Sequence, residues 1–221
     1  MNKGIYCIAG AIGLLAMAPA GAATIVNGSF ELGTDPGAGF TTQVAGSTAI
    51  TGWTVGGFGV DYIGGYWQAS DGVRSLDLSA LNAGSVSQAI DTVIGQLYTV
   101  TFDLSGNPDA GTGSKISVVS ISGSLPNIET YTVGATNSRS NMNWETFSYS
   151  FTAFATSSLL TFASAEYNPY GPALDNVSII AGGGGTGSTV PEPASWALLM
   201  TGFGMIGLVS RRRGALQQVV S

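Results

Sequence analysis

The chain has 221 residues, with 13 acidic side chains, 7 basic side chains and no histidine. The lack of histidine removes the usual general base, the commonest transition-metal ligand and the Ser-His-Asp triad. Residues 24–189 contain twelve of the acids but only Arg74, Lys115 and Arg139 as bases, a net charge of −9. Such a surface disfavours nucleic acid and anionic lipid as partners.

The N-terminus predicts a signal peptide over residues 1–23. Lys3 supplies a positive charge, residues 5–18 are apolar, and Ala20-Gly21-Ala22 is a small-x-small cleavage site. Cys7, the only cysteine, lies within this segment and would leave with it. We therefore expect an exported domain that folds without a disulfide.

Residues 24–181 predict an all-β domain, because short apolar–polar alternations are separated by glycine, serine and threonine. No part of this region has the pattern of a convincing amphipathic helix. The expected strands cover residues 24–26, 40–44, 50–55, 60–63, 74–78, 85–90, 98–104, 115–122, 128–133, 145–152, 159–163 and 174–180. Short strands at this spacing are typical of a jelly-roll β-sandwich.

The clearest strand is residues 98–104. Tyr98, Val100, Phe102 and Leu104 alternate with polar side chains, so one face of the strand is expected in the core. Turn-forming residues 105–108 end it.

The C-terminal region divides into four segments. Residues 182–189 are a glycine-rich linker, residues 190–193 read Val-Pro-Glu-Pro, residues 194–209 are apolar, and residues 211–213 are all arginine. Basic flanks stay in the cytoplasm, so we expect a transmembrane helix over 194–209 and a cytoplasmic tail over 214–221. Sixteen apolar residues are slightly fewer than the roughly 20 of an ordinary spanning helix. A plain membrane anchor, with residues 190–193 as its linker, is the alternative.

This order of motif, apolar segment and basic cluster resembles the PEP-CTERM sorting signal of bacterial surface proteins, over residues 190–213. The resemblance implies processing by an exosortase-type enzyme, a transient inner-membrane anchor, and release to the cell surface or extracellular matrix. The residues that it assigns to sorting and processing are Val190, Pro191, Glu192, Pro193, Arg211, Arg212 and Arg213.

The domain resembles the choice-of-anchor C family of exported bacterial proteins. The resemblance is carried by short sequence segments: Asn-Gly-Ser-Phe-Glu at 27–31, Gly-Trp at 52–53, Asp-Gly at 71–72, Arg-Ser-Leu-Asp-Leu at 74–78, the segment 102–108, Trp144 with Phe151, Gly-Pro at 171–172 and Leu-Asp-Asn-Val at 174–177. This likeness implies a galactose-binding-like sandwich and no established activity.

The domain's first and last segments also resemble those of jelly-roll carbohydrate-binding modules, and this likeness implies a structural calcium ion shared by Glu31 and Asp175. Calcium needs six to eight oxygen ligands, so backbone carbonyls and a further side chain would complete the shell. The alternative is that Glu31 caps a turn and Asp175 holds a loop through hydrogen bonds.

The candidate ligand-binding residues lie in or beside a glycine-rich turn at residues 64–68. They are Asp61, Tyr62, Tyr66, Trp67, Gln68 and Asp71. Aromatic rings stack on the C–H faces of sugars, and nearby Asp or Gln side chains bind the hydroxyl groups. The alternative is that the aromatic residues pack in the core.

Three functions remain open. The first is a surface-displayed module that binds extracellular polysaccharide, and the second is a structural protein of an envelope or biofilm matrix with no ligand pocket. The third is a glycoside hydrolase, which requires two carboxylates across one cleft. The spacing of the acids does not indicate such a pair, so we expect a non-catalytic protein.

Overall fold

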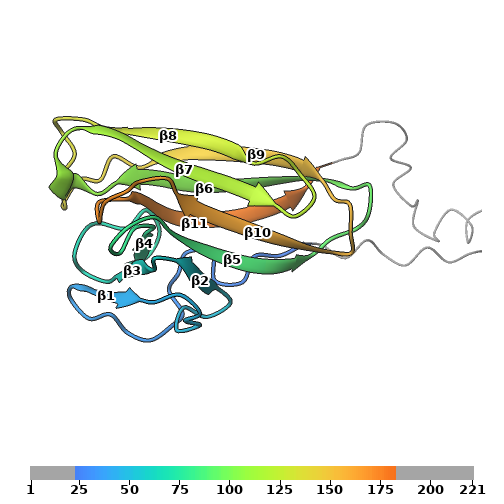
Figure 1. The fold of residues 1–221 in the computed structure, drawn as a ribbon, viewed down its shortest axis with the longest axis horizontal. Helices are drawn as coiled ribbons and strands as arrows, with labels where there is room; N and C mark the ends of the chain where they lie inside the picture. The colour runs from blue at the N-terminus through green and yellow to red at the C-terminus, as the bar shows by residue number, and fades with distance from the viewer. Residues whose placement is uncertain (1–22, 183–221) are drawn as a thin grey trace, which may run out of the picture. The chain divides into compact units, whose positions relative to one another are not determined.

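The computed structural model describes residues 23–182, which form eleven β-strands and one short 3₁₀ turn (Figure 1). The strands are β1 (Phe40–Gln43), β2 (Thr54–Gly57), β3 (Val60–Ile63), β4 (Ser75–Asp77), β5 (Gly84–Asp91), β6 (Leu97–Gly106), β7 (Gly113–Ile121), β8 (Asn127–Val133), β9 (Glu145–Thr152), β10 (Ser157–Ser164) and β11 (Pro172–Ala181). The turn η1 (Pro108–Ala110) follows β6. The predicted all-β sandwich is confirmed.

The strands form two sheets, and every neighbouring pair is antiparallel. One sheet has the order β1-β3-β4-β11-β6-β9 and the other β2-β5-β10-β7-β8. Figure 1 shows the long strands β5 to β11 stacked in layers, with the short strands β1 to β4 gathered on one side. The last described strand, β11, therefore lies at the centre of the six-stranded sheet.

One hydrophobic core lies between the sheets. The predicted inward face of β6 is confirmed, because Tyr98, Val100, Phe102 and Leu104 are all fully buried. The ring of Phe102 meets the ring of Phe162 from β10 edge to face, with the centroids 4.9 Å apart. Aromatic pairs in this geometry stabilise a core beyond the area that they bury.

Residues 27–31, with the sequence Asn-Gly-Ser-Phe-Glu, form a tight turn that brings the start of the domain to β11. Asn27 and Phe30 both adopt positive φ, and the backbone carbonyl of Asn27 accepts a 3.0 Å hydrogen bond from Nε1 of Trp53. A Cβ on Gly28 would stand 1.8 Å from the carbonyl oxygen of Val177, so this position requires glycine.

Residues 24–26 do not form the predicted strand, and the side chain of Gln88 explains why. Its amide accepts from the backbone N–H of Val26 at 2.7 Å and donates to the carbonyl of Val26 at 2.9 Å. One side chain thus replaces a strand partner. The strand predicted at residues 50–55 begins later than expected, since β2 starts at Thr54. Residues 50–53 form a turn instead, in which Gly52 has positive φ. The other ten predicted strands are each found within two residues of their expected bounds.

A second, smaller apolar cluster lies on the outer face of the six-stranded sheet. Its buried members are Ile63, Trp67, Met142 and Ala173, with Tyr66 and Trp144 packed against them. Ala173 points outward from β11, whereas its neighbour Leu174 points into the main core. The segment from 64 to 74 therefore covers part of a sheet face that would otherwise meet water.

Within residues 23–182, no helix is long and apolar enough to cross a membrane. The predicted signal peptide, the linker from 183 onward, the sorting motif and the transmembrane helix lie outside the described residues.

Candidate functional site

The six predicted ligand-binding residues separate into buried and surface positions. Tyr62 is fully buried and its hydroxyl donates to the carbonyl of Phe30, while Trp67 is 4% exposed and donates from Nε1 to Oγ of Ser75 at 2.8 Å. Their rings therefore pack inside the fold. Asp61 is also buried and accepts a 2.6 Å hydrogen bond from the hydroxyl of Thr42.

The remaining three predicted residues, Tyr66, Gln68 and Asp71, lie at the surface. The backbone carbonyl of Gln68 accepts from Nε1 of Trp144 at 3.0 Å, and its backbone N–H donates to the carbonyl of Arg139 at 2.8 Å. Asp71 is exposed, and its backbone N–H donates to Asp175. The structure does not gather these three side chains around one cavity.

Tyr66 instead belongs to a surface cluster with Phe40, Asp109 and Arg139, which we call the Tyr66 patch. The Tyr66 hydroxyl donates to Oδ2 of Asp109 at 2.7 Å, and the guanidinium carbon of Arg139 lies 4.0 Å from the Tyr66 ring centroid. Phe40 meets the same ring edge to face, with centroids 5.0 Å apart. Phe40 remains 44% exposed, so an aromatic surface faces solvent beside the charged pair.

Charge is balanced within the Tyr66 patch by an ion pair. Nη2 of Arg139 lies 2.9 Å from Oδ2 of Asp109, and Nε of Arg139 donates to Oδ1 of Asp109 at 3.0 Å. Burial acts to raise the pKa of Asp109, but the hydrogen bonds from Arg139 and Tyr66 outweigh it and lower that pKa. The two-bond geometry orients the guanidinium and keeps donors and acceptors side by side.

The Tyr66 patch lies at the far end of β6 from the point where the described chain ends. Asp109 follows the C-terminal end of β6, whereas the N–H of Gly182 donates to the carbonyl of Leu97 at its start, at 2.8 Å. A ten-residue strand spans roughly 30 Å. The patch is therefore separated from Gly182, the last described residue, by about the length of β6.

Sequence reasoning missed Asp109, Arg139 and Phe40 as neighbours of Tyr66. They lie 43, 73 and 26 positions away and come from three separate segments of the chain. The one local signal was the turn Asn107-Pro108-Asp109, in which the side chain of Asn107 accepts from the N–H of Asp109. That turn fixes where the Asp109 carboxylate lies.

Glu31 and Asp175 hold the two halves of one loop. Oδ2 of Asp175 accepts from the backbone N–H groups of Ser70 and Asp71, at 2.7 and 3.0 Å. Oε1 of Glu31 accepts from those of Val73 and Arg74, at 2.8 and 2.7 Å. Four backbone amides thus donate to one oxygen of each of the two carboxylates that the resemblance assigned to calcium.

These residues do not fit a shared calcium ion. Asp175 is fully buried, and its Oδ1 accepts from the N–H of Asn176 at 2.7 Å, so both of its oxygens already have donors. Within residues 23–182, no group of three or more acidic or cysteine side chains is arranged to hold a metal. The arrangement matches the hydrogen-bonding alternative.

Two pairs of acids face each other in the six-stranded sheet, Asp61 opposite Asp77 and Asp103 opposite Asp175. All four side chains are buried. Asp77 accepts from the N–H groups of Ser79 and Gly171 and from Nδ2 of Asn107, so it joins three loops. Burial raises the pKa of Asp77, and separately that of Asp175, to about 7.

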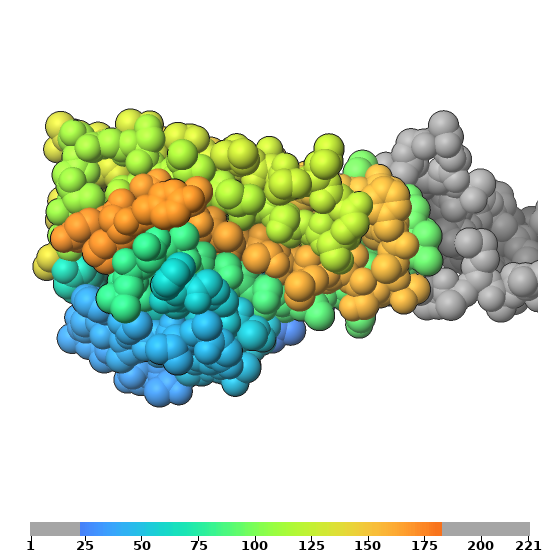
Figure 2. All heavy atoms as spheres, viewed as in Figure 1, coloured from blue at the N-terminus to red at the C-terminus, as the bar shows by residue number. Residues whose placement is uncertain are grey.

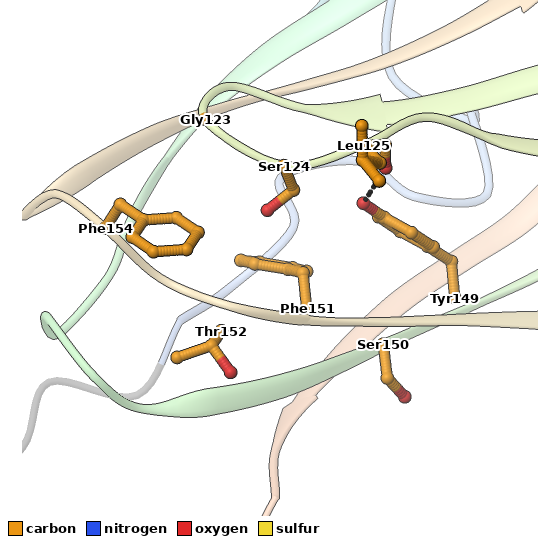
Figure 3. A pocket seen from close by; sticks show the side chains of 8 residues that line it. All are labelled: Gly123, Ser124, Leu125, Tyr149, Ser150, Phe151, Thr152 and Phe154. Carbon is orange, nitrogen blue, oxygen red and sulfur yellow. Dashed lines mark hydrogen bonds between the residues drawn. The ribbon is translucent and has the colours of Figure 1, made fainter.

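An open hollow of about 430 Å³ lies at the other end of the sandwich, between the β7–β8 turn and β9. Figure 3 shows the rings of Phe151 and Phe154 beside Ser124, with the Tyr149 hydroxyl bonded to the carbonyl of Leu125. Gly123, Ser150 and Thr152 complete the lining. None of the eight lining residues is acidic, so this hollow does not supply the carboxylate pair that glycoside hydrolysis needs.

Two family models match the chain. Residues 23–180 match "Protein of unknown function (DUF642)", and residues 189–213 match the PEP-CTERM protein-sorting motif. The predicted resemblance to a PEP-CTERM signal is thereby confirmed.

Two curated proteins are similar in sequence. Halomucin of Haloquadratum walsbyi is 31% identical over 80% of this chain, and the Arabidopsis thaliana protein "DUF642 L-GALACTONO-1,4-LACTONE-RESPONSIVE GENE 1" is 28% identical over 74%. The matches span 2% of halomucin and 44% of the Arabidopsis protein.

Solved carbohydrate-binding modules are similar in fold. A family 35 module from Paenibacillus barcinonensis has a TM-score of 0.45 at 18% identity, covering 64% of this chain and 99% of its own. A family 35 module from Clostridium thermocellum has a TM-score of 0.43 at 8% identity, with the same two coverages. TmCBM61, solved with β-1,4-galactotriose, has a TM-score of 0.43 at 16% identity, covering 60% and 90%.

Proposed function

The chain belongs to the DUF642 family and carries a PEP-CTERM motif, and we propose that it is an exported, surface-sorted domain that binds extracellular polysaccharide without catalysis. Sorting is carried by the tail. An exosortase-type enzyme recognises residues 190–193, cuts the chain near them and releases the domain to the cell surface or the extracellular matrix.

The observation that carries the binding proposal is the Tyr66 patch. A sugar ring packs its C–H face against the exposed ring of Phe40, beside Tyr66. Arg139, whose side chain is 52% exposed, donates to the sugar hydroxyl groups, and Asp109 accepts from them. The existing ion pair holds both groups in place before the ligand arrives, which reduces the entropy cost of binding.

The position of the Tyr66 patch suits a surface-displayed binder. It lies at the opposite end of β6 from Gly182, the last described residue, so the point from which the chain continues is well separated from a polymer bound there. Arg139 is also the most exposed base of the described residues, since Lys115 is buried and Arg74 is half-buried. A polysaccharide with uronic acid groups therefore gains a charge-assisted contact there.

A glycan array tests the binding proposal. The full chain, held in detergent, is compared with Tyr66→Ala and Arg139→Ala, and Phe58→Ala serves as a matched control because Phe58 is 66% exposed on the β2–β3 turn. We expect binding to at least one polysaccharide class, weakened about tenfold or more by the two patch variants, as for a lost contact worth about 1.4 kcal/mol.

Two results contradict the proposal. No retained glycan, together with concentration-dependent self-association by light scattering, favours the structural matrix protein without a ligand pocket. Cleavage of an oligosaccharide that is lost on replacing two acids favours the glycoside hydrolase.

A further inference from the structure

Two loops and two strand ends meet where the described chain finishes. The N–H of Gly95 donates to the carbonyl of Ala153 at 2.8 Å, which joins the β5–β6 loop to the β9–β10 loop. The N–H of Gly182 donates to the carbonyl of Leu97 at 2.8 Å, which joins the chain just after β11 to the start of β6. In Figure 2 these green and gold loops form the right-hand end of the domain.

This end of the domain presents large apolar side chains to solvent. Ile94 is 63% exposed, Leu97 38%, Phe154 66% and Ile180 64%, and we call these four residues the end face. The four segments at this end, residues 91–97, 122–127, 152–157 and 180–182, contain one charged side chain, Asp91. Exposed apolar residues gathered in one place mark an interaction surface.

The length of chain beyond Gly182 limits what can cover the end face. Eleven residues separate Gly182 from Ala194, where the apolar segment 194–209 begins. A fully extended chain of eleven residues spans at most about 40 Å. The end face is the part of the domain from which this linker leaves, whereas the Tyr66 patch lies roughly 30 Å further away along β6.

We propose that the end face rests on the surface of the lipid bilayer while the C-terminal apolar segment is inserted, which assumes the sorting route of the proposed function. Its apolar side chains enter the region between the headgroups and the acyl chains. Apolar burial drives this contact, because a domain with a net charge of −9 gains nothing from anionic headgroups. The partner is therefore a lipid surface of zwitterionic headgroups, which has no net charge.

This contact orients the domain during sorting. With the end face on the bilayer, β6 runs away from the membrane and the Tyr66 patch faces outward. Residues 183–193 are kept within a short distance of the bilayer, where an enzyme that cuts at residues 190–193 must work. Docking in this way raises the effective concentration of the motif at the membrane surface.

Fluorescence quenching by nitroxide-bearing lipid tests the docking. The full chain with Cys7→Ser is reconstituted in phosphatidylcholine vesicles, and a single cysteine carries an environment-sensitive dye. The positions are Ile94→Cys and Phe154→Cys on the end face, with Phe58→Cys as a control of equal exposure at 66% and Leu199→Cys in the apolar segment.

We expect strong quenching at 199, quenching at 94 and 154 at least twofold greater than at 58, and little at 58. Adding Ile94→Asp and Ile180→Asp together to the Phe154→Cys chain should return its quenching to the level at 58, with an unchanged melting temperature. Equal quenching at 94, 154 and 58, with 199 strongly quenched, overturns the docking and leaves the sorting proposal standing. No quenching at 199 overturns both. A dye shift without quenching that disappears on dilution shows a second copy on the end face and also overturns it.

Discussion

Glu31 and Asp175, 144 positions apart, bind the two ends of the same five-residue loop. Asp175 accepts hydrogen bonds from the N–H groups of Ser70 and Asp71, and Glu31 accepts them from those of Val73 and Arg74. The loop in turn covers Asp103, which accepts from the hydroxyl of Ser70. The first and last parts of the domain are thereby joined through a segment that belongs to neither.

Asp175→Ala should destabilise the domain by about 1–3 kcal/mol in total, because part-buried N–H groups lose their acceptor. The three donors at risk are the backbone amides of Ser70, Asp71 and Asn176. Asp71→Ala is the matched control, because that side chain is exposed and should cost less than about 0.5 kcal/mol. Urea unfolding measures both. Equal losses in the two variants would show that the loop does not depend on Asp175.

A calcium chelator should leave the melting temperature unchanged, because backbone amides already donate to both oxygens of Asp175 and to Oε1 of Glu31. A ligand that binds only the native state would raise its stability with concentration. Thermal melts with chelator and with added calcium make the comparison. A rise with calcium that is absent in Asp175→Ala would restore the shared ion.

Stability should fall as pH rises from about 4 to above 7. The folded-state pKa of Asp77 and that of Asp175 are each raised to about 7 by burial, above the usual value of 3.8. A raised pKa gives stability that is fully present below the unfolded value and lost as pH passes the folded value. Melts at pH 5 and pH 8 should favour pH 5, and Asp77→Asn with Asp175→Asn should reduce the difference. A wild-type protein more stable at pH 8 would contradict this.

Phe102→Ala should cost about 3–5 kcal/mol, because it leaves a cavity between the sheets. Phe102 is fully buried against Phe162 and Phe147. Phe58→Ala removes the same ring from an exposed position and should be nearly neutral. Urea unfolding that gave Phe102→Ala a loss below about 1 kcal/mol would place the Phe102 ring outside the core.

Gly28→Ala should destabilise the domain by about 1–3 kcal/mol or more, because the new Cβ meets the carbonyl oxygen of Val177. Gly39→Ala is the control, since nothing lies within 4 Å of a Cβ there. Both variants are compared by thermal melting. Equal melting temperatures would mean that the turn at 27–31 moves away from β11 without cost.

Changing Pro191, Glu192 and Pro193 to alanine should leave membrane insertion intact but block processing of the tail. Immunoblots of membrane and surface fractions, probed for the domain, follow the chain. Removing Arg211, Arg212 and Arg213 should instead disturb retention of the tail's end in the cytoplasm. Release of the alanine variant at the wild-type size and rate would show that residues 190–193 are only a linker.

Local patterns predicted the long strands because each one shows its own buried face. The alternation around Phe102 needs no knowledge of its partners, since a strand buried on one face must repeat with period two. The strand predicted at residues 24–26 was wrong, because the side chain of Gln88 makes the backbone hydrogen bonds that a neighbouring strand would have made.

The candidate site was harder to predict, because glycine-rich turns suggest exposure that tertiary packing then removes. Trp67 lies among glycines and polar residues, yet Met142 and Ala173 enclose it. Tyr66, its neighbour, is only partly buried and contacts Arg139 and Asp109, which approach from elsewhere in the chain. The difference in burial between these two adjacent aromatic residues therefore depends on segments more than 40 positions away, which a local sequence pattern does not reveal.

The central place of β11 sets the order in which the molecule can be completed. β11 pairs with β4 on one side and β6 on the other, and it is the last described strand to be synthesised. A chain emerging from its N-terminus therefore holds two unjoined parts of one sheet until residue 181 has been delivered. Contacts between such distant segments also close slowly. The six-stranded sheet therefore acquires its final form only when the last described strand has been delivered, and a chain truncated before residue 172 would lack the strand that joins its two parts.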